Sequence, residues 1–403
     1  MALNVSPYFS NFLNGLKHSI KIILGKNIKP SGTERFTIKL KPQKEATILL
    51  KTEPISHIHQ APCSKLSRPK SIQDKRPPLK AIHFRDVFIQ INSLIVIQKN
   101  YAYLQPFWKG DAFNNVDLIW GWICEKKGKW IYIKKKEANP LTKGIFLGHP
   151  FTQNWYHWCI ETLSKVEIFN QLPRPYNEWP LLVSIQNAPM KNFMDALHFI
   201  FPNQEIHFLL HNKTYRMENL IMLDSPMFGN PNPFHYSKIN KNNQIFALRY
   251  AQKYAQRMQE GLKPSQNKKK IFLARSQKNR IYNQEEIQAL LESMGFITVF
   301  CENLSFEEQR QLFHDAEFIV GPTGASWTNL IFSRPETRAI IWAPEFTNKV
   351  TTYSDLAFAQ NIKLTYLYFP TKAKRWIDFM HSNERTYLSL NELKVTILTF
   401  LQP

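Results

Sequence analysis

The second half of the chain alternates short apolar runs with amphipathic segments, and this alternation constrains the fold more than any other feature. Ser305 with Glu308 three residues later is typical of a helix start, and Asn283 with Glu286 repeats the pattern. Strands that alternate with helices predict a parallel sheet covered by helices. The runs expected to be strands are residues 270–274, 296–300, 316–320, 339–342 and 363–368.

A turn rich in glycine follows the third run. The free N–H groups and the dipole at the start of the helix expected after it favour an anion, most often a phosphate. Because the glycine spacing matches neither common nucleotide-binding fingerprint, an ordinary strand-to-helix turn is the alternative. The residues of the turn are Gly321, Pro322, Thr323, Gly324 and Ala325, and those of the helix start include Thr328 and Asn329.

Three cations, Arg275, Lys278 and Arg280, lie in the loop after the first run. The carboxyl ends of parallel strands meet at one edge of a sheet, so this loop is expected beside the glycine-rich turn. Guanidinium groups bind diphosphate oxygens in pairs, and they would stabilise charge on a departing diphosphate. A solvated basic loop is the alternative.

The first half is expected to be α/β as well. Apolar side chains with a period of two predict strands and hairpins in residues 81–133. A linker at 264–270 is the expected boundary between two domains. The further elements expected before it are strands at 179–185, 205–210 and 218–223 and helices at 188–201 and 238–261.

One expected helix of the first half has an unusual composition. His157 and Glu161 fall one turn apart on a polar stripe. The stripe also holds Asn154 and Lys165, and Trp155 lies on the apolar side. A carboxylate can fix the tautomer of an imidazole and stabilise its charged form, so the pair could act as a base and its orienter. A surface ion pair beside core aromatics is the alternative.

The N-terminal region is strongly basic. The 403-residue chain has a net charge of +21, and residues 1–90 hold 16 Lys and Arg against 5 Asp and Glu. Residues 9–23 predict an amphipathic helix that either lies on an anionic membrane or packs on the protein. Residues 26–80, rich in lysine and proline, are expected to form an extended lead-in. Such a charge suits nucleic acid, an anionic membrane or phosphorylated substrates.

Composition and missing motifs bound the remaining classes. A hydrophobic content of 43% allows two cores. The four cysteines form no CxxC pattern, so neither a zinc site nor a disulfide framework is expected. A reducing cytoplasm is the expected environment. No apolar run approaches the roughly 18 residues of a membrane span. Asp-x-Asp is missing and no His-x-x-x-His pair suggests zinc, so no metal site is expected.

Three segments together resemble the glycosyltransferases of family 61, also called the DUF563 or capsular polysaccharide biosynthesis type. The likeness covers roughly Ile82 to Tyr368. The segments are Asn154-Trp155-Tyr156-His157-Trp158 with Glu161 and Lys165, Arg275 with Arg280-Ile281-Tyr282-Asn283 and Glu285, and Leu304-Ser305-Phe306-Glu307-Glu308-Gln309 running through the glycine-rich turn to Thr328-Asn329-Leu330-Ile331-Phe332.

The resemblance implies a GT-B-like α/β fold, in which two Rossmann-like domains face each other across a cleft behind an extended basic N-terminal lead-in. The expected divisions are a lead-in at 1–80, an acceptor-side domain at 81–263, a nucleotide-sugar domain at 264–380, and a C-terminal helix at 381–403 that crosses back to the first domain.

It also implies an inverting, metal-independent transfer of a sugar from a nucleotide-sugar, by expectation a UDP-sugar, to a surface glycan such as capsule or lipopolysaccharide. No cofactor is implied beyond this co-substrate. The expected partners are the donor, a glycan acceptor that could be lipid-linked, and an anionic membrane bound through the N-terminal helix, without a specific nucleic acid. The expected location is the cytoplasm, at the inner face of the membrane.

At the matching positions the resemblance implies roles for single residues. The donor diphosphate would be held by Arg275, Arg280 and the turn at 321–325, with Lys278 beside them. The donor pocket would be shaped by Asn283, Thr328 and Asn329. The acceptor hydroxyl would face His157 or Glu161, with Asn154, Trp155 and Lys165 on the acceptor side.

The chain departs from the family at two points. Thr323 stands where many members carry histidine, and no acidic residue accompanies Trp342, where a donor ribose would bind. These departures favour an alternative function, a non-catalytic protein that keeps the GT-B fold and binds glycan or nucleic acid. The net charge favours the nucleic-acid version.

Overall fold

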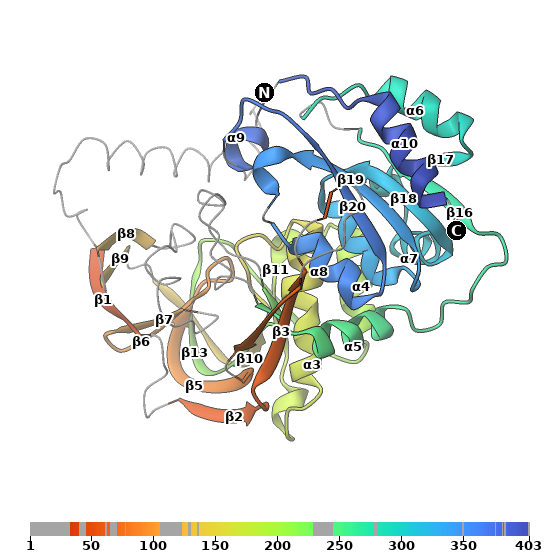
Figure 1. The fold of residues 1–403 in the computed structure, drawn as a ribbon. Helices are drawn as coiled ribbons and strands as arrows, with labels where there is room; N and C mark the ends of the chain where they lie inside the picture. The colour runs from red at the N-terminus through yellow and green to blue at the C-terminus, as the bar shows by residue number, and fades with distance from the viewer. Residues whose placement is uncertain are drawn as a thin grey trace, which may run out of the picture.

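The computed structural model contains two large β-sheets, one from each half of the chain (Figure 1). The first sheet lies at the lower left of this view and the second at the upper right. The structure describes residues 33–39, 46–60, 63–64, 71–76, 78–104, 123–127, 130–134, 137–228, 245–276, 280–348, 350–374, 376–380, 382 and 384–401.

The first sheet has 11 strands and combines a parallel part with an antiparallel part. The first four strands below run parallel to one another, and the others pair mainly as antiparallel neighbours. In spatial order they are β12 (Ile206–Leu209), β11 (Leu181–Ser184), β10 (Ala138–Phe146), β13 (Thr214–Leu223), β5 (Lys80–Ile89), β6 (Ile95–Gln98), β7 (Tyr101–Leu104), β1 (Thr33–Lys39), β9 (Trp130–Lys134) and β8 (Ile123–Lys127), and β2 (Thr47–Lys51) pairs with β5.

Part of the predicted lead-in is built into the fold. Both β1 and β2 belong to the first sheet. A hairpin of β3 (Ile55–Gln60) and β4 (Ser71–Arg76) follows, and the carbonyl of Cys63 accepts the N–H of Tyr366 in the second half at 2.8 Å. The basic helix predicted for residues 9–23 lies outside the described residues.

The second sheet confirms the predicted alternation of strands and helices. Its five strands are all parallel, because each returns through a crossover that lies on a face of the sheet. In spatial order they are β17 (Phe296–Val299), β16 (Lys269–Leu273), β18 (Ala316–Pro322), β19 (Arg338–Pro344) and β20 (Lys363–Phe369).

The helix starts were predicted with mixed success. Ser305 and Glu308 form a complete capping box, as expected. Asn283 is the residue before α6 (Gln284–Ser293), so the predicted helix start is confirmed, but its side chain does not cap the helix and instead exchanges hydrogen bonds with the backbone of Leu388. The described α-helices are α3 (Val166–Phe169), α4 (Lys191–Ile200), α5 (Leu248–Met258), α6 (Gln284–Ser293), α7 (Phe306–Asp315), α8 (Thr352–Ala359), α9 (Trp376–Met380) and α10 (Leu390–Leu401).

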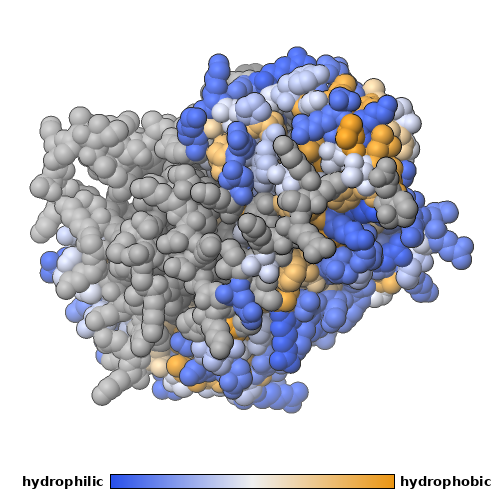
Figure 2. Space-filling view, in the orientation of Figure 1, coloured by the Kyte–Doolittle hydropathy of each residue, from blue (hydrophilic) through white to orange (hydrophobic). Residues whose placement is uncertain are grey.

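Two further expectations need correction. Residues 245–246 were expected in a helix but form β15 (Ile245–Phe246), which pairs with β14 (Met227–Phe228). The C-terminal helix α10 packs on α6 and stacks Phe400 against Phe318 of β18, so its described contacts lie on the second sheet and not on the first. Val395 and Leu398 are exposed on its outer side beside polar residues such as Lys394, and this part of the surface is mixed in character (Figure 2).

One apolar cluster is shared by both halves. It joins buried residues of the first sheet, such as Ile145, to residues of the second, such as Ile271 and Trp327. Helix α5 lies within this cluster, and Gln259 at its end donates to the carbonyl of Ile331 at 2.8 Å. The described chain is therefore a mixed α/β structure whose halves are packed through a common core. Among the described residues, none of the helices has both the length and the apolar character needed to cross a membrane.

Candidate active site

Each sheet has one place where successive strands are added on opposite sides of a starting strand, and the candidate residues lie at these two places. In the second sheet β16 lies between β17 and β18, and in the parallel part of the first sheet β10 lies between β11 and β13. Successive crossovers leave such a point in opposite directions, which opens a crevice at the carboxyl ends of the strands. The chain leaves β10 toward His149 and β13 toward Asp224, and it leaves β16 toward Arg275 and β18 into the glycine-rich turn.

The segment with the predicted His–Glu pair begins with a π-helical turn, η1 (His157–Thr162), which continues through a short 3-10 turn, η2 (Leu163–Lys165), into α3. Single π turns are rare and frequent at functional sites. The residues of the predicted polar stripe differ in their exposure to solvent. Glu161 is 2% exposed and Lys165 is buried as well, whereas the His157 side chain is 23% exposed.

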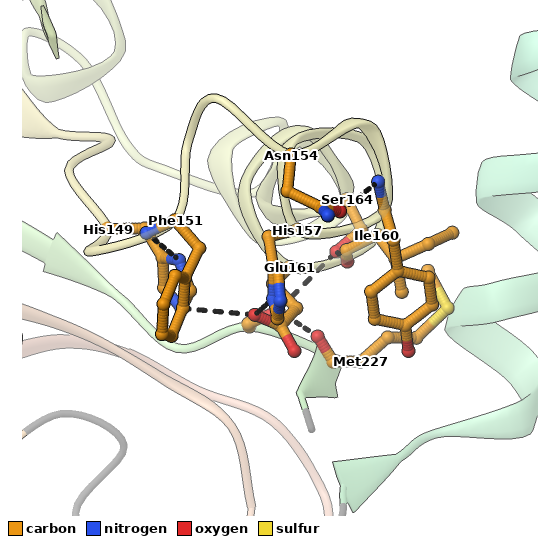
Figure 3. Close-up of polar contacts among 10 residues, drawn as sticks. His149, Phe151, Asn154, His157, Ile160, Glu161, Ser164 and Met227 are labelled. Carbon is orange, nitrogen blue, oxygen red and sulfur yellow. Dashed lines mark hydrogen bonds and ion pairs between the residues drawn. The ribbon is translucent and has the colours of Figure 1, made fainter. Parts of the chain in front are cut away.

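Glu161 lies between two histidines (Figure 3). Its Oε2 is 2.6 Å from Nδ1 of His157 and 3.0 Å from Nε2 of His149. The rings of His149 and His157 stack with centroids 5.3 Å apart. The ring of Phe151 also stacks on that of His157, with centroids 4.9 Å apart. The sequence predicted the His157–Glu161 pair but missed His149. The only feature of the sequence that points to His149 is its position directly after the apolar run from Gly144 to Gly148, which begins in β10.

The charges of this cluster are balanced internally. Burial alone would raise the pKa of the Glu161 carboxyl, but attraction by His157 and the hydrogen bond and charge of His149 outweigh burial and hold that pKa well below its usual range. Burial lowers the pKa of His149, against the hydrogen bond with Glu161. The carboxylate therefore stays ionised at neutral pH, with Nδ1 of His157 and Nε2 of His149 both within 3.0 Å of its Oε2.

A second buried pair lies one turn deeper. Burial lowers the pKa of Lys165 to about 8, although Asp224 and Glu161 attract its charge. Burial likewise raises the pKa of Asp224 to about 6, against a hydrogen bond from the backbone of Lys80. Lys165 was predicted on the acceptor side, but its burial places it behind the His–Glu cluster.

The types of side chain in the cluster would also suit a metal ion. Ligand atoms of His149, His157 and Glu161 lie within 4.8 Å of one another. A histidine on a metal normally donates its second ring N–H to an acceptor. Here Nδ1 of His149 instead accepts the backbone N–H of Phe151 at 3.1 Å, which leaves the ring proton on Nε2, facing Glu161. The contacts fit a hydrogen-bonded cluster better than a metal centre.

The second region is a small pocket that is lined in part by two arginines. Arg275 donates to the carbonyl of Thr323, and Nε of Arg280 has no hydrogen-bond partner in the described part of the chain. Burial, followed by repulsion from Arg280, lowers the pKa of Arg275 to about 9. The lining residues are Arg275, Arg280, Tyr282, Pro322, Thr323, Trp342, Phe369, Phe379 and Thr386.

No carboxylate among the described residues forms an ion pair with either arginine. Glu302 attracts Arg275, but less strongly than Arg280 repels it. Two neighbouring, half-buried cations therefore lack a balancing anion in the part of the chain that the structure describes. Lys278, predicted beside them, lies outside the described residues.

Other predicted donor residues are built into the fold. Asn283 is fully engaged with Leu388 and Glu286. Thr328 is buried in the 3-10 helix η8 (Ala325–Phe332), which replaces the expected α-helix. Gly321 is needed for packing, since a Cβ there would lie 2.8 Å from the Cβ of Leu273. Thr323 and Pro322 do line the pocket.

The two regions are joined by direct contacts between their elements. Nε1 of Trp155 donates to Oδ1 of Asn329 at 2.7 Å. Tyr156 meets Tyr353 edge to face at 6.1 Å, and the hydroxyl of Tyr353 donates to the carbonyl of Gly324 at 2.7 Å. The segment that carries His157 thus abuts the glycine-rich turn. Asn154 accepts the backbone N–H of Tyr156 and so fixes the start of this segment.

An internally balanced His–Glu cluster beside an arginine pocket in a mixed α/β structure has the groups that a transferase for an anionic donor needs. Residues 155–340 match the family model Glycosyltransferase 61. This match confirms, over this region, the resemblance to glycosyltransferase family 61 found in the sequence, and it suggests glycosyltransferase activity. No curated protein matches the chain.

Proposed function

We propose that the protein is an inverting glycosyltransferase that moves a sugar from a nucleotide-sugar to a glycan acceptor. The observation that carries this proposal is the pair of half-buried arginines, Arg275 and Arg280, without an ion-pair partner among the described residues. Buried cations of like charge are costly unless an anion completes the site. A nucleoside diphosphate supplies such an anion, and the guanidinium groups would stabilise it as it leaves.

The arrangement of the two regions supports a GT-B architecture with the donor on the second sheet and the acceptor on the first. Each sheet has its own winding reversal, and contacts such as that of Trp155 with Asn329 bring the two strand ends together. In this proposal the domains are 81–263 and 264–380, and their shared core holds the two sites in register.

The chemistry assigned to the site is a single displacement. His157, with Nδ1 toward Glu161, takes the proton of the acceptor hydroxyl on Nε2 while the hydroxyl oxygen attacks the anomeric carbon. The bond from that carbon to the diphosphate oxygen breaks, and its electron pair leaves with the diphosphate toward Arg275 and Arg280. Attack opposite the leaving group inverts the configuration. The guanidinium groups supply the charge compensation, so the transfer is proposed to be metal-independent.

The proposal extends to a UDP-sugar as the donor and to a surface glycan, such as capsule or lipopolysaccharide, as the acceptor. The basic first 90 residues would favour an anionic membrane, and with it a lipid-linked acceptor at the cytoplasmic face. These finer assignments rest on the family resemblance and on charge.

Nucleotide binding tests the proposal directly. We expect UDP, GDP or a nucleotide-sugar to raise the melting temperature of the purified protein. Arg275→Ala should abolish this shift, whereas His157→Ala should keep it and lose turnover. Arg338→Ala is the matched control, since Arg338 begins β19 at the edge opposite the pocket.

Absence of binding at millimolar ligand would refute the proposed donor site. Salt-sensitive binding to random DNA without any nucleotide-induced shift would instead support the non-catalytic alternative, which the net charge of +21 favours.

A further inference from the structure

We infer that His149 is a positioning residue, which holds the Glu161 carboxylate so that His157 presents an unprotonated Nε2 to the acceptor. This inference deepens the function proposed above and rests on it. The observation behind it is a chain of three contacts that starts at a backbone N–H and ends at the His157 ring (Figure 3).

The chain of contacts begins at the end of β10. His149 lies three residues beyond this strand and is buried, with Phe228 packed edge to face against its ring at 5.8 Å. The backbone N–H of Phe151 points at Nδ1 from 3.1 Å. A ring nitrogen that accepts an N–H carries no proton, so the proton of the neutral ring is on Nε2.

The second contact fixes Glu161. Nε2 of His149 lies 3.0 Å from Oε2, and a carboxylate can only accept. The same oxygen lies 2.6 Å from Nδ1 of His157, so this nitrogen must also be protonated. A neutral His157 with a proton on Nδ1 leaves the lone pair of Nε2 free. The tautomer of the proposed base is thus determined by a residue that touches neither substrate nor His157 through a hydrogen bond.

The neighbourhood of the cluster sets the direction of the expected effect. Besides the three cluster residues, the titratable groups that act on it are Lys165, which faces Glu161 and His149, and Asp224, which acts through Lys165. Loss of the His149 donor removes a hydrogen bond that stabilises the carboxylate. The His157–Glu161 pair then holds a proton more tightly, whichever of the two groups carries it.

Two substitutions of His149 distinguish the effect of its N–H donor from the effect of its side-chain volume. His149→Met and His149→Gln both remove the ring nitrogen Nδ1 that accepts the Phe151 N–H, but only glutamine retains an N–H that can reach Glu161. For His149→Met we expect kcat to fall about tenfold or more while KM changes little, and the acidic limb of the kcat profile to move up by about one pH unit. His149→Gln should recover most of both changes.

Histidine-selective ¹⁵N NMR provides a readout that does not need activity. In the unmodified protein we expect the His157 signals of a ring protonated on Nδ1 and free on Nε2. In His149→Met the titration midpoint of His157 should rise, and in His149→Gln it should return toward the original value.

The outcomes distinguish this inference from the proposed function. Inactivity of every form, together with the expected tautomer and shifts, would defeat the transferase proposal and leave the positioning role standing. Equal behaviour of the methionine and glutamine variants, or an unchanged His157 midpoint in both, would overturn the positioning role. Stoichiometric Co²⁺ binding that the unmodified protein shows and His149→Met lacks would also overturn it, by making the cluster a metal centre.

Discussion

The ends of β10 and β13 and the ends of β16 and β18 are equivalent places in their two sheets, but they balance charge differently. At the first, the Glu161 carboxylate is surrounded by two histidines, and the buried Lys165 and Asp224 lie close by. At the second, Arg275 and Arg280 repel each other, and no described carboxylate pairs with them. The first region is electrostatically complete without a ligand, and the second becomes complete only when an anion binds.

This difference assigns the two regions different parts of the reaction. A base must keep one tautomer in every cycle, so its partners belong to the protein. A donor pocket must release its product, so part of its charge balance belongs to the ligand. Internal balance therefore marks the proposed acceptor side, and imbalance marks the proposed donor side.

The largest effect that tests this comparison is expected for Glu161→Gln. Removing the charge leaves two buried histidine donors without an ionised acceptor. We expect transfer to fall by a factor of about 10² to 10⁴ and the free energy of unfolding to fall by about 2 kcal/mol. Nucleotide affinity should stay unchanged in calorimetry, with the exposed Glu178→Gln as the control. An equal loss of nucleotide affinity would contradict separate roles for the two regions.

A variant of the other region should behave in the opposite way. Arg275→Met removes one of two repelling cations, so the ligand-free protein should melt at the same temperature or higher. Its nucleotide affinity should fall about 100-fold, because one of the diphosphate-binding forks is gone. Thermal shift with and without UDP measures both effects. A drop in the ligand-free melting temperature would show that an undetected partner balances Arg275.

The pH dependence of stability provides a third test. The folded-state pKa of Glu161 is depressed, so its contribution to stability is present above the unfolded pKa near 4.5 and is lost as pH falls below it. The pKa of Asp224 is raised to about 6, so this group has the opposite sign and reduces stability as pH rises from about 4 to 6. Urea unfolding between pH 3 and 7 should show a smaller acid loss for Glu161→Gln. Asp224→Asn should remove the opposite slope, and identical profiles for all three proteins would count against these assignments.

The smallest effect is expected at the glycine-rich turn. A Cβ on Gly324 would lie 3.1 Å from Nη2 of Arg275, so Gly324→Ala should displace the guanidinium and weaken nucleotide binding several-fold without loss of stability. A Cβ on Gly321 would instead meet the Cβ and carbonyl oxygen of Leu273 at 2.8 and 3.0 Å. Gly321→Ala should therefore reduce the free energy of unfolding by about 1–3 kcal/mol. Titration calorimetry and urea unfolding of both variants separate the two cases, and a stability loss at Gly324 would refute the distinction.

The second sheet was predictable because of how its strands are buried. Central parallel strands are covered on both faces and appear as continuous apolar runs, such as the one that ends at Val320. The first sheet was less visible. The first six residues of β10 are partly or fully exposed, and they include Pro140 and Lys143, so neither a run nor an alternation indicates the strand. Missing β10 also meant missing His149 at its end.

Within the candidate site, spacing predicted contact but not environment. An interval of four residues correctly brought His157 and Glu161 together. Periodicity assumes a regular α-helix, however, and it did not indicate that Glu161 and Lys165 are buried. It also could not tell that Asn283 and Asn329 use their amide groups to join distant segments.

The π-helical turn η1 acts as a phase shift within one helical segment. It contains one residue per turn more than an α-helix, and each residue of an α-helix corresponds to a rotation of about 100°. Residues before the shift face the second sheet, as Trp155 does through its hydrogen bond to Asn329. Residues after the shift face the interior of the first sheet. A single-residue deletion inside the turn would preserve a helix and nearly every side chain, yet it would rotate one half of the segment against the other and separate the faces that the two sheets require.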